Sequence, residues 1–248
     1  MIEVTNDGPI AIVVLKHGKV NAMDLELLES LTETLNELAA SNSVGAVVLT
    51  GTGTVFSAGV DLKRLIAETP GYLERFFPAI RKLFFEAFTF PKPLVGAING
   101  HALAGGCVLA CSCDYRVLNR ESKIGMPELR VGLPLPPEGI EILRFVAATQ
   151  HMQRIVTSGK TFVGESAIAA GLGDESVPAD VVLARSMEIA NELLSVPANV
   201  FHLSKRQIRQ PVIDLIRANE SHFINEIDPL WRDPKILASV AAYVKSRL

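Results

Sequence analysis

Three short apolar runs, separated by helical patterns, constrain the fold of this chain more than any other feature. The runs are IAIVVL, which lies between Gly8-Pro9 and Gly18, then GAVVLT and LVGAI. Uninterrupted runs of this length, rich in Val and Ile, are typical of strands buried on both faces. Because each is followed by a helical pattern, we predict an α/β fold with a largely parallel sheet up to about residue 195.

Two amphipathic helices are predicted in the first half of the chain. One begins near Asp24, whose carboxylate caps free backbone N–H groups, and ends before Gly45. Its apolar face consists of Leu27, Leu28, Leu31, Leu35 and Leu38. The second covers residues 70–88, is rich in Phe and ends before Pro91-Lys92-Pro93, because proline cannot continue a helix. We expect this helix to form one wall of a ligand pocket.

Strand patterns are absent after Pro197, and we predict helices interrupted at Pro211 and at Asp228-Pro229. These helices cover residues 198–210, 212–225 and 234–248. We therefore divide the chain into a core of residues 1–195 and a helical region of residues 196–248. No low-complexity linker separates the two parts, so the helical region is expected to pack on the core or on a neighbouring subunit.

The composition argues against several classes of protein. The chain has 248 residues, 48% of them hydrophobic, and a net charge of −3, whereas nucleic-acid binding requires a basic surplus. No apolar run approaches the ~18 residues that span a bilayer, and the N-terminus lacks the pattern of an export signal. We expect a cytoplasmic protein. The final Ser246-Arg247-Leu248 resembles a peroxisomal signal, which would apply in a eukaryotic source.

The three cysteines lie close together, at Cys107, Cys111 and Cys113. On a helix, the first two have Cβ atoms ~5 to 6 Å apart, which is too far for a disulfide. A zinc site needs a fourth ligand, and the spacing to His101 does not fit one. We expect reduced, buried thiols and no metal.

Two glycine-rich turns are the first candidate functional feature. In GTGTVFSAGVDLKRL, a turn at residues 59–61 opens a helix, so the N–H of Val60 points out of a helix N-terminus. In AINGHALAGGCVLACSCDYRVL, residues 104–106 open another helix, and the missing Cβ of Gly105 lets a ligand oxygen approach its amide. Glycine also serves tight helix–strand packing. Two such turns facing one another would supply the paired donors of an oxyanion hole.

Glu128 is the second candidate feature. It follows Pro127 in an otherwise apolar stretch between Ile124 and Leu135. Lost hydration in such surroundings raises the pKa of a carboxyl group toward the range useful for a general acid or base near neutrality. An inert glutamate in a surface loop is an equally simple interpretation of the local sequence.

Five segments carry a family resemblance: GKVNAMD, VFSAGVDLKRL, FPKPLVGAINGHALAGGCVLACSCDYRV, GMPELRVGLP and SGKTFVGESAIAAGLGDESV. In this order they resemble the crotonase superfamily, the enoyl-CoA hydratases and isomerases, over most of residues 10–195. The resemblance implies a spiral of repeated ββα units with trailing helices that assemble subunits into homotrimers, often paired as hexamers. It also implies an acyl-CoA thioester substrate, with coenzyme A as part of that substrate and no separate cofactor.

The resemblance also implies roles for individual positions. The N–H groups of Val60 and Gly105 would hold the thioester oxygen while it becomes an enolate. Lys63 matches a position near the CoA phosphates, and Lys19 and Ala58 match positions that contact pantetheine or adenine. Further residues expected to bind substrate are Asp61, Leu62, Gly106, Val108 and Glu138.

Val108 marks a departure from the family pattern. Typical hydratases carry two glutamates, at the positions matched by Val108 and Glu128. Hydration asks one group to activate water and another to manage the proton. Moving a double bond from the 3,4 to the 2,3 position needs a single carboxylate, which removes a proton at C2 and returns it at C4. The resemblance therefore favours an enoyl-CoA isomerase that uses Glu128 over a hydratase.

Two alternatives stay open at this point. Glu138 follows Pro136-Pro137, where it fits the first turn of a helix. If it reached the pocket, it would restore a second carboxylate and with it hydratase or other lyase activity. A non-catalytic acyl-CoA-binding protein with the same fold is the other alternative. His101 is interpreted as a hydrogen-bonded structural residue and Met126 as pocket lining.

Overall fold

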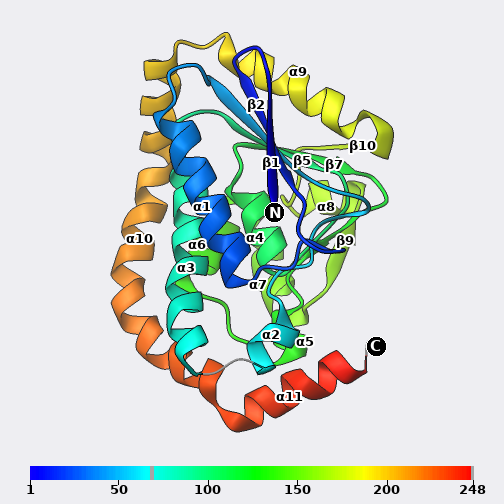
Figure 1. Ribbon diagram of the computed structural model, residues 1–248, viewed down its shortest axis with the longest axis vertical. Helices are drawn as coiled ribbons and strands as arrows, with labels where there is room; N and C mark the ends of the chain where they lie inside the picture. The colour runs from blue at the N-terminus through cyan, green and yellow to red at the C-terminus, as the bar shows by residue number, and fades with distance from the viewer. Residues whose placement is uncertain (68–69, 247–248) are drawn as a thin grey trace.

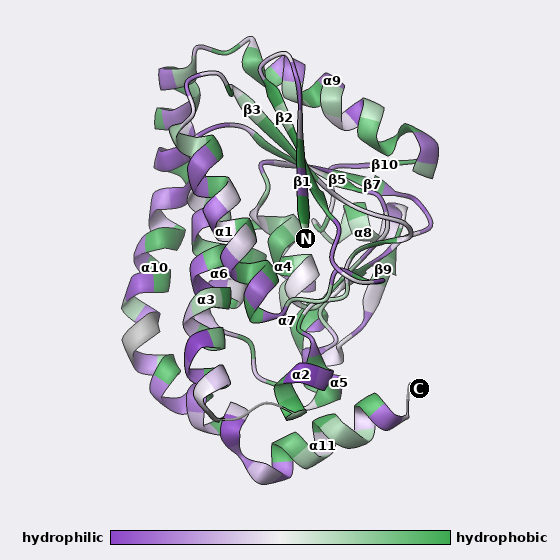
Figure 2. Ribbon diagram, in the orientation of Figure 1, coloured by the Kyte–Doolittle hydropathy of each residue, from purple (hydrophilic) through white to green (hydrophobic). Residues whose placement is uncertain are grey.

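A six-stranded sheet is the larger of two sheets in the computed structural model, which describes residues 1–67 and 70–246 (Figure 1). Its order is β1-β2-β3-β5-β7-β10, and all neighbours are parallel except β1 and β2. The strands are β1 (Ile2–Asp7), β2 (Ile10–Leu15), β3 (Ala46–Gly51), β5 (Leu94–Ile98), β7 (Tyr115–Asn119) and β10 (Glu175–Val177). Figure 2 shows β2, β3 and β5 as largely hydrophobic. The three strands predicted from apolar runs, and the largely parallel sheet, are confirmed.

A second, four-stranded sheet has the order β4-β6-β8-β9. Its strands are β4 (Val55–Ser57), β6 (His101–Leu103), β8 (Lys123–Gly125) and β9 (Thr161–Val163). Each of β3, β5 and β7 is followed by a short strand of this sheet, and β4, β6 and β8 run parallel to one another. Each of these short strands is followed by a helix. Helices α2 (Leu62–Ala67) and α3 (Pro70–Thr89) follow β4, α4 (Gly105–Ser112) follows β6, and α5 (Glu128–Val131) follows β8. The implied spiral of ββα units is confirmed.

This repeat positions the candidate residues. The carboxyl ends of neighbouring parallel strands meet at the same edge of a sheet, and there their loops lie together. The turn containing Val60 follows β4, Gly105 follows β6 and Glu128 follows β8. Segments separated by more than 60 residues along the chain are thus brought to one edge of the smaller sheet.

Helices α1 and α3 supply much of the core. Helix α1 (Leu25–Ala40) begins where predicted, because Asp24 Oδ1 accepts from Leu27 N–H at 2.9 Å. Its five predicted apolar leucines are all buried. Helix α3 packs against α1 and buries Phe76, Phe84 and Phe88.

The remaining helices of the described chain are α6 (Pro137–Val146), α7 (Thr149–Ser158), α8 (Glu165–Ala169), a 3₁₀ turn at Ala179–Val181, α9 (Val182–Leu194), α10 (Ala198–Arg232) and α11 (Pro234–Lys245).

The predicted breaks in the C-terminal region are wrong. Helix α10 runs continuously through Pro211 and Pro229 and extends along one whole side of the molecule (Figure 1). A proline inside a helix costs a hydrogen bond and a steric clash, about 3 kcal/mol. Val212, Ile213 and Ile216 are buried directly after Pro211, and this packing offsets the local cost. Tertiary contacts therefore override the local preference of proline to end a helix.

Helices α10 and α11 pack on the rest of the same chain, α10 against α6 and α3, and α11 against α2 and α5. The division at residues 195 and 196 stays a prediction.

Cys107, Cys111 and Cys113 are buried free thiols, as expected. Within residues 1–67 and 70–246, no helix is long and apolar enough to cross a bilayer. Arg247 and Leu248 of the candidate peroxisomal signal lie outside the described residues.

Candidate active site

The two glycine-rich turns touch each other. Gly59 has φ +79°, and a Cβ placed on it would stand 2.6 Å from the Cβ of Ala104 and 2.9 Å from the nitrogen of Gly105. Neither distance leaves room for a side chain, so only glycine fits at position 59. The turn after β4 is thereby packed directly against the start of α4.

Both candidate N–H donors are open to a ligand. Met23 N–H donates to Gly59 O at 2.8 Å and Asp61 N–H donates to Met23 O at 3.0 Å, so the N–H of Val60 between them points away from Met23. Gly105 is the first residue of α4, where an N–H has no acceptor within the helix. Among the described residues, neither Val60 N–H nor Gly105 N–H donates a hydrogen bond. The arrangement has the form of an oxyanion hole.

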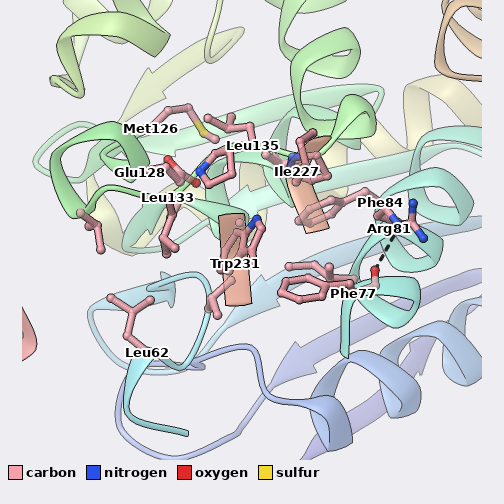
Figure 3. A pocket seen from close by; sticks show the side chains of 18 of the residues that line it. Leu62, Phe77, Arg81, Phe84, Met126, Glu128, Leu133, Leu135, Ile227 and Trp231 are labelled. Atoms are coloured by element: carbon pink, nitrogen blue, oxygen red, sulfur yellow. Dashed lines mark hydrogen bonds between the residues drawn. The ribbon is translucent and has the colours of Figure 1, made fainter. Parts of the chain in front are cut away.

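A cavity of about 150 Å³ lies beside these donors and is lined mainly by apolar side chains. Helix α3 forms one wall, as predicted, with Phe76, Phe77, Ile80, Arg81 and Phe84. Met126, Leu133 and Leu135 come from the segments around α5, and Ile227 and Trp231 from α10 (Figure 3). The C-terminal helices thus close the cavity of their own chain. Such a cavity fits an acyl chain, with the donors at its carbonyl end.

Glu128 faces this cavity as the first residue of α5 (Figure 3). Its Oε2 is shielded from solvent and accepts no hydrogen bond within the described part of the chain. Burial raises the pKa of the Glu128 carboxyl from 4.5 to about 8, although its own backbone N–H lowers the pKa in part. A carboxyl group with a pKa near neutrality can both accept and return a proton.

The pH dependence of the rate should report this carboxyl group. A general base acts in its ionised form, so kcat/KM of a reaction that Glu128 starts as a base should rise as pH increases through about 8 and level off above it. Initial rates measured from pH 6 to pH 10 check the expectation. A profile already flat between pH 6 and pH 9 would show that Glu128 is not the titrating base.

Comparisons with known proteins agree with this geometry. The family model described as "Enoyl-CoA hydratase/isomerase" matches residues 5–224. The chain belongs to the enoyl-CoA hydratase/isomerase family. It is therefore an acyl-CoA-transforming enzyme of the crotonase superfamily, which confirms the resemblance identified in the sequence.

Individual members of the family point to more than one reaction. The chain is 30% identical to mouse "Enoyl-CoA delta isomerase 1, mitochondrial" over 229 residues, 91% of this chain and 79% of the relative. It is 33% identical to a "Putative enoyl-CoA hydratase" of Thermus thermophilus, over 80% of this chain and 79% of the relative. The human mitochondrial delta3-delta2-enoyl-CoA isomerase superposes with a TM-score of 0.94 at 26% identity, over 99% of this chain and 97% of that structure.

Val108 is buried and lines the cavity, so an isopropyl group stands at the position that the sequence resemblance matches to a glutamate of typical hydratases. Glu138 lies in the first turn of α6, is 3% exposed and is not among the described residues that line the cavity. His101 Nδ1 accepts from Lys123 N–H at 3.0 Å, as expected of a structural histidine. Met126 lines the cavity, as expected.

The other predicted binding residues lie in different surroundings. Ala58 and Leu62 line the cavity. Asp61 accepts from the N–H groups of Lys63 and Arg64 at 3.0 and 3.1 Å, so its carboxylate caps α2. Lys19 and Lys63 are exposed, where a long cation can reach an anionic group outside the cavity. Gly106 packs on β4, since a Cβ there would stand 2.4 Å from Ser57 O.

Sequence reasoning missed the contribution of α10 and α11, which add Ile224, Ile227, Asp228, Trp231 and Tyr243 to the lining. One signal was available. Trp231 is the chain's single tryptophan and lies in a largely polar helix, yet it is 5% exposed and packs on Phe77 with ring centroids 4.9 Å apart. A lone large aromatic residue in a polar helix indicates a buried anchor.

Proposed function

We propose that this enzyme is an enoyl-CoA isomerase that converts 3-enoyl-CoA to 2-enoyl-CoA. One observation carries the proposal: Glu128, a carboxylate with a shielded oxygen, lines the cavity together with two open N–H groups, while Val108 stands at the position that the sequence resemblance matches to the second carboxylate of hydratases. The other carboxylate of the described lining, Asp228, belongs to α10 and not to the turns that carry these groups. Val108 can neither accept nor deliver a proton. A site with one shielded carboxyl group suits proton transfer within the substrate better than activation of water.

The steps follow from the arrangement. The thioester oxygen accepts from Val60 N–H and Gly105 N–H, and the Glu128 carboxylate removes a proton from C2. The electron pair of the C–H bond forms a C1–C2 double bond while the carbonyl π pair moves to the oxygen, which carries the negative charge of the dienolate between the two donors. The Glu128 acid then returns the proton to C4. The C3–C4 π pair forms the new C4–H bond, the C1–C2 pair becomes the C2–C3 double bond, and the carbonyl is restored. The carboxylate is regenerated, no atom is gained or lost, and no cofactor is required.

The relatives support this proposal without deciding it, because both isomerases and hydratases match the chain. A direct comparison of substrates tests it. The purified protein is supplied with 3-hexenoyl-CoA and, separately, with 2-hexenoyl-CoA, and the products are separated by chromatography. We expect 2-hexenoyl-CoA from the first and little 3-hydroxyhexanoyl-CoA from the second. Water addition faster than isomerisation would overturn the proposal in favour of a hydratase.

The length of the accepted acyl chain should depend on Trp231, which closes the cavity against Phe77. The preference for a long chain is measured as kcat/KM for 3-dodecenoyl-CoA divided by kcat/KM for 3-hexenoyl-CoA. We expect Trp231→Ala to raise this preference by about tenfold, which is the size of effect that a few methylene contacts produce. Trp231→Phe, which preserves an aromatic wall, should change the ratio less. Equal losses on both substrates would mean that Trp231 only stabilises the fold.

We further propose that subunits assemble into homotrimers or pairs of trimers. Exposed apolar residues recur along α10, which supports an interface on this helix. They are Val200, Leu203, Ile208, Leu215, Phe223 and Leu230. The mass of the assembly in solution tests this.

A further inference from the structure

We infer that Ala104 is a positioning residue, which sets the direction and spacing of the Gly105 N–H in the oxyanion hole. The inference rests on the proposed function of that hole. Ala104 has φ 55° and ψ −126°, and among the described non-glycine residues only Asn21 also has a positive φ. A side chain with a Cβ adopts this conformation at a cost in free energy. The methyl group therefore calls for an explanation.

A second turn in the same chain shows that the local structure does not require alanine. Gly164 has φ 50° and ψ −130° between the three-residue strand β9 and α8, just as Ala104 lies between β6 and α4. The first helical hydrogen bonds are alike: Ala104 O accepts from the residues three and four positions on at 2.8 and 3.2 Å, and Gly164 O does so at 2.9 and 3.3 Å. Away from the cavity, the chain uses glycine for this turn.

The methyl group of Ala104 lies between the two oxyanion turns. Its Cβ would be 2.6 Å from a Cβ on Gly59, so it occupies the space directly beside Gly59. The N–H of Ala104 donates to Gly125 O at 2.9 Å, which ties the residue to β8, the strand that leads to Glu128. Ala104 is thus in contact with the Val60 turn through its methyl group and with the Glu128 segment through its backbone.

The direction of the Gly105 N–H depends on Ala104 directly. Both belong to one planar peptide unit, so the ψ angle of Ala104 fixes where that N–H points. A methyl group held against Gly59 restricts this angle, and glycine at the same position would leave it freer. An N–H donor whose direction varies stabilises the negative oxygen of the transition state less well. The same variation changes the binding of the neutral carbonyl of the substrate only slightly.

The test compares Ala104→Gly with Gly164→Ala. For Ala104→Gly we expect kcat to fall about tenfold with KM within about twofold and a Tm equal to or above that of the wild type, because strain is relieved. Gly164→Ala places a Cβ 3.2 Å from Arg120 O and creates the same strain elsewhere, so Tm should fall while kcat stays unchanged. Ala104→Ser, which retains a Cβ, should recover most of the rate lost in Ala104→Gly.

Three outcomes would overturn the inference: full kcat in Ala104→Gly, a loss of kcat that Ala104→Ser does not recover, or a parallel loss of kcat and Tm. Failure of the proposed function is recognised separately, because the wild-type protein would then not isomerise 3-hexenoyl-CoA. In that case the exchange of the C2 protons of butanoyl-CoA in D₂O, followed by NMR, reports enolate formation. The same three variants are then compared by that rate.

Discussion

Glu128→Gln is expected to lower kcat for isomerisation by roughly 10² to 10⁴ and to leave ligand affinity mostly unchanged. Glutamine preserves the shape of the side chain but cannot carry a proton between C2 and C4. The measurement is kcat with 3-hexenoyl-CoA, together with the Kd of saturated hexanoyl-CoA. The loss should fall on kcat, because the proposed role of Glu128 is at the reacting carbons and not at the CoA portion.

Glu138→Gln is the matched control for that variant. Glu138 is also a buried carboxyl group, but it lies in α6 outside the described cavity lining, so its loss should change kcat by no more than a few fold. If Glu138→Gln reduced hydration of a 2-enoyl-CoA as strongly as Glu128→Gln, the hydratase alternative would gain. If Glu128→Gln changed no measurable activity, Glu128 would not be the proton carrier.

The stability of Glu128→Gln separates lost chemistry from lost folding. The pKa of Glu128 is about 8 in the folded protein and near 4.5 when unfolded, so the folded state holds the proton more tightly. The wild type therefore loses stability as pH rises from about 4.5 through 8. Glutamine has no such dependence. We expect the variant to be more stable than the wild type at pH 9, on the order of a few kcal/mol, and equal to it at pH 4.

Gly105→Pro is expected to lower the rate by about 10² or more, because it deletes one oxyanion donor. Proline suits the first position of a helix, where its missing N–H leaves the helical hydrogen bonds intact. Gly105→Ala is the matched control, since it keeps the N–H and introduces the same Cβ, 2.9 Å from Met23 Sδ and 3.4 Å from Phe84. The difference between the two variants isolates the donor, and equal rates in both would remove it from the mechanism.

The sequence predicted those elements of the fold that depend on residues within a single segment. Asp24 caps α1 through its own carboxylate, and the buried strand IAIVVL needs no knowledge of its neighbours. The three-residue strands β4, β6 and β8 are too short to give a periodic pattern, and only the family resemblance implied them. Continuity of α10 through Pro211 depends on burial of residues that contact distant segments, which a local rule does not capture.

The candidate site also has features that a single segment predicts and features that depend on the tertiary fold. Glycine at position 59 and the apolar surroundings of Glu128 are visible in single segments, and they indicated both the candidate oxyanion turns and the candidate proton carrier. Trp231 and Ile227 reach the cavity only because α10 folds back over α3 and α6. The positive φ of Ala104 is likewise not predictable from the sequence, since residues with a Cβ rarely adopt it.

Transfer of deuterium within the substrate tests the central claim most directly. 3-Hexenoyl-CoA carrying two deuterium atoms at C2 is converted in ordinary water, and NMR locates the label in the product. Because Glu128 Oε2 is shielded from solvent, the account predicts 2-hexenoyl-CoA with a substantial fraction of the removed deuterium at C4. Product in which the hydrogen added at C4 comes entirely from water, or a 3-hydroxyacyl-CoA as the main product, would contradict a single shielded carboxyl group as the proton carrier.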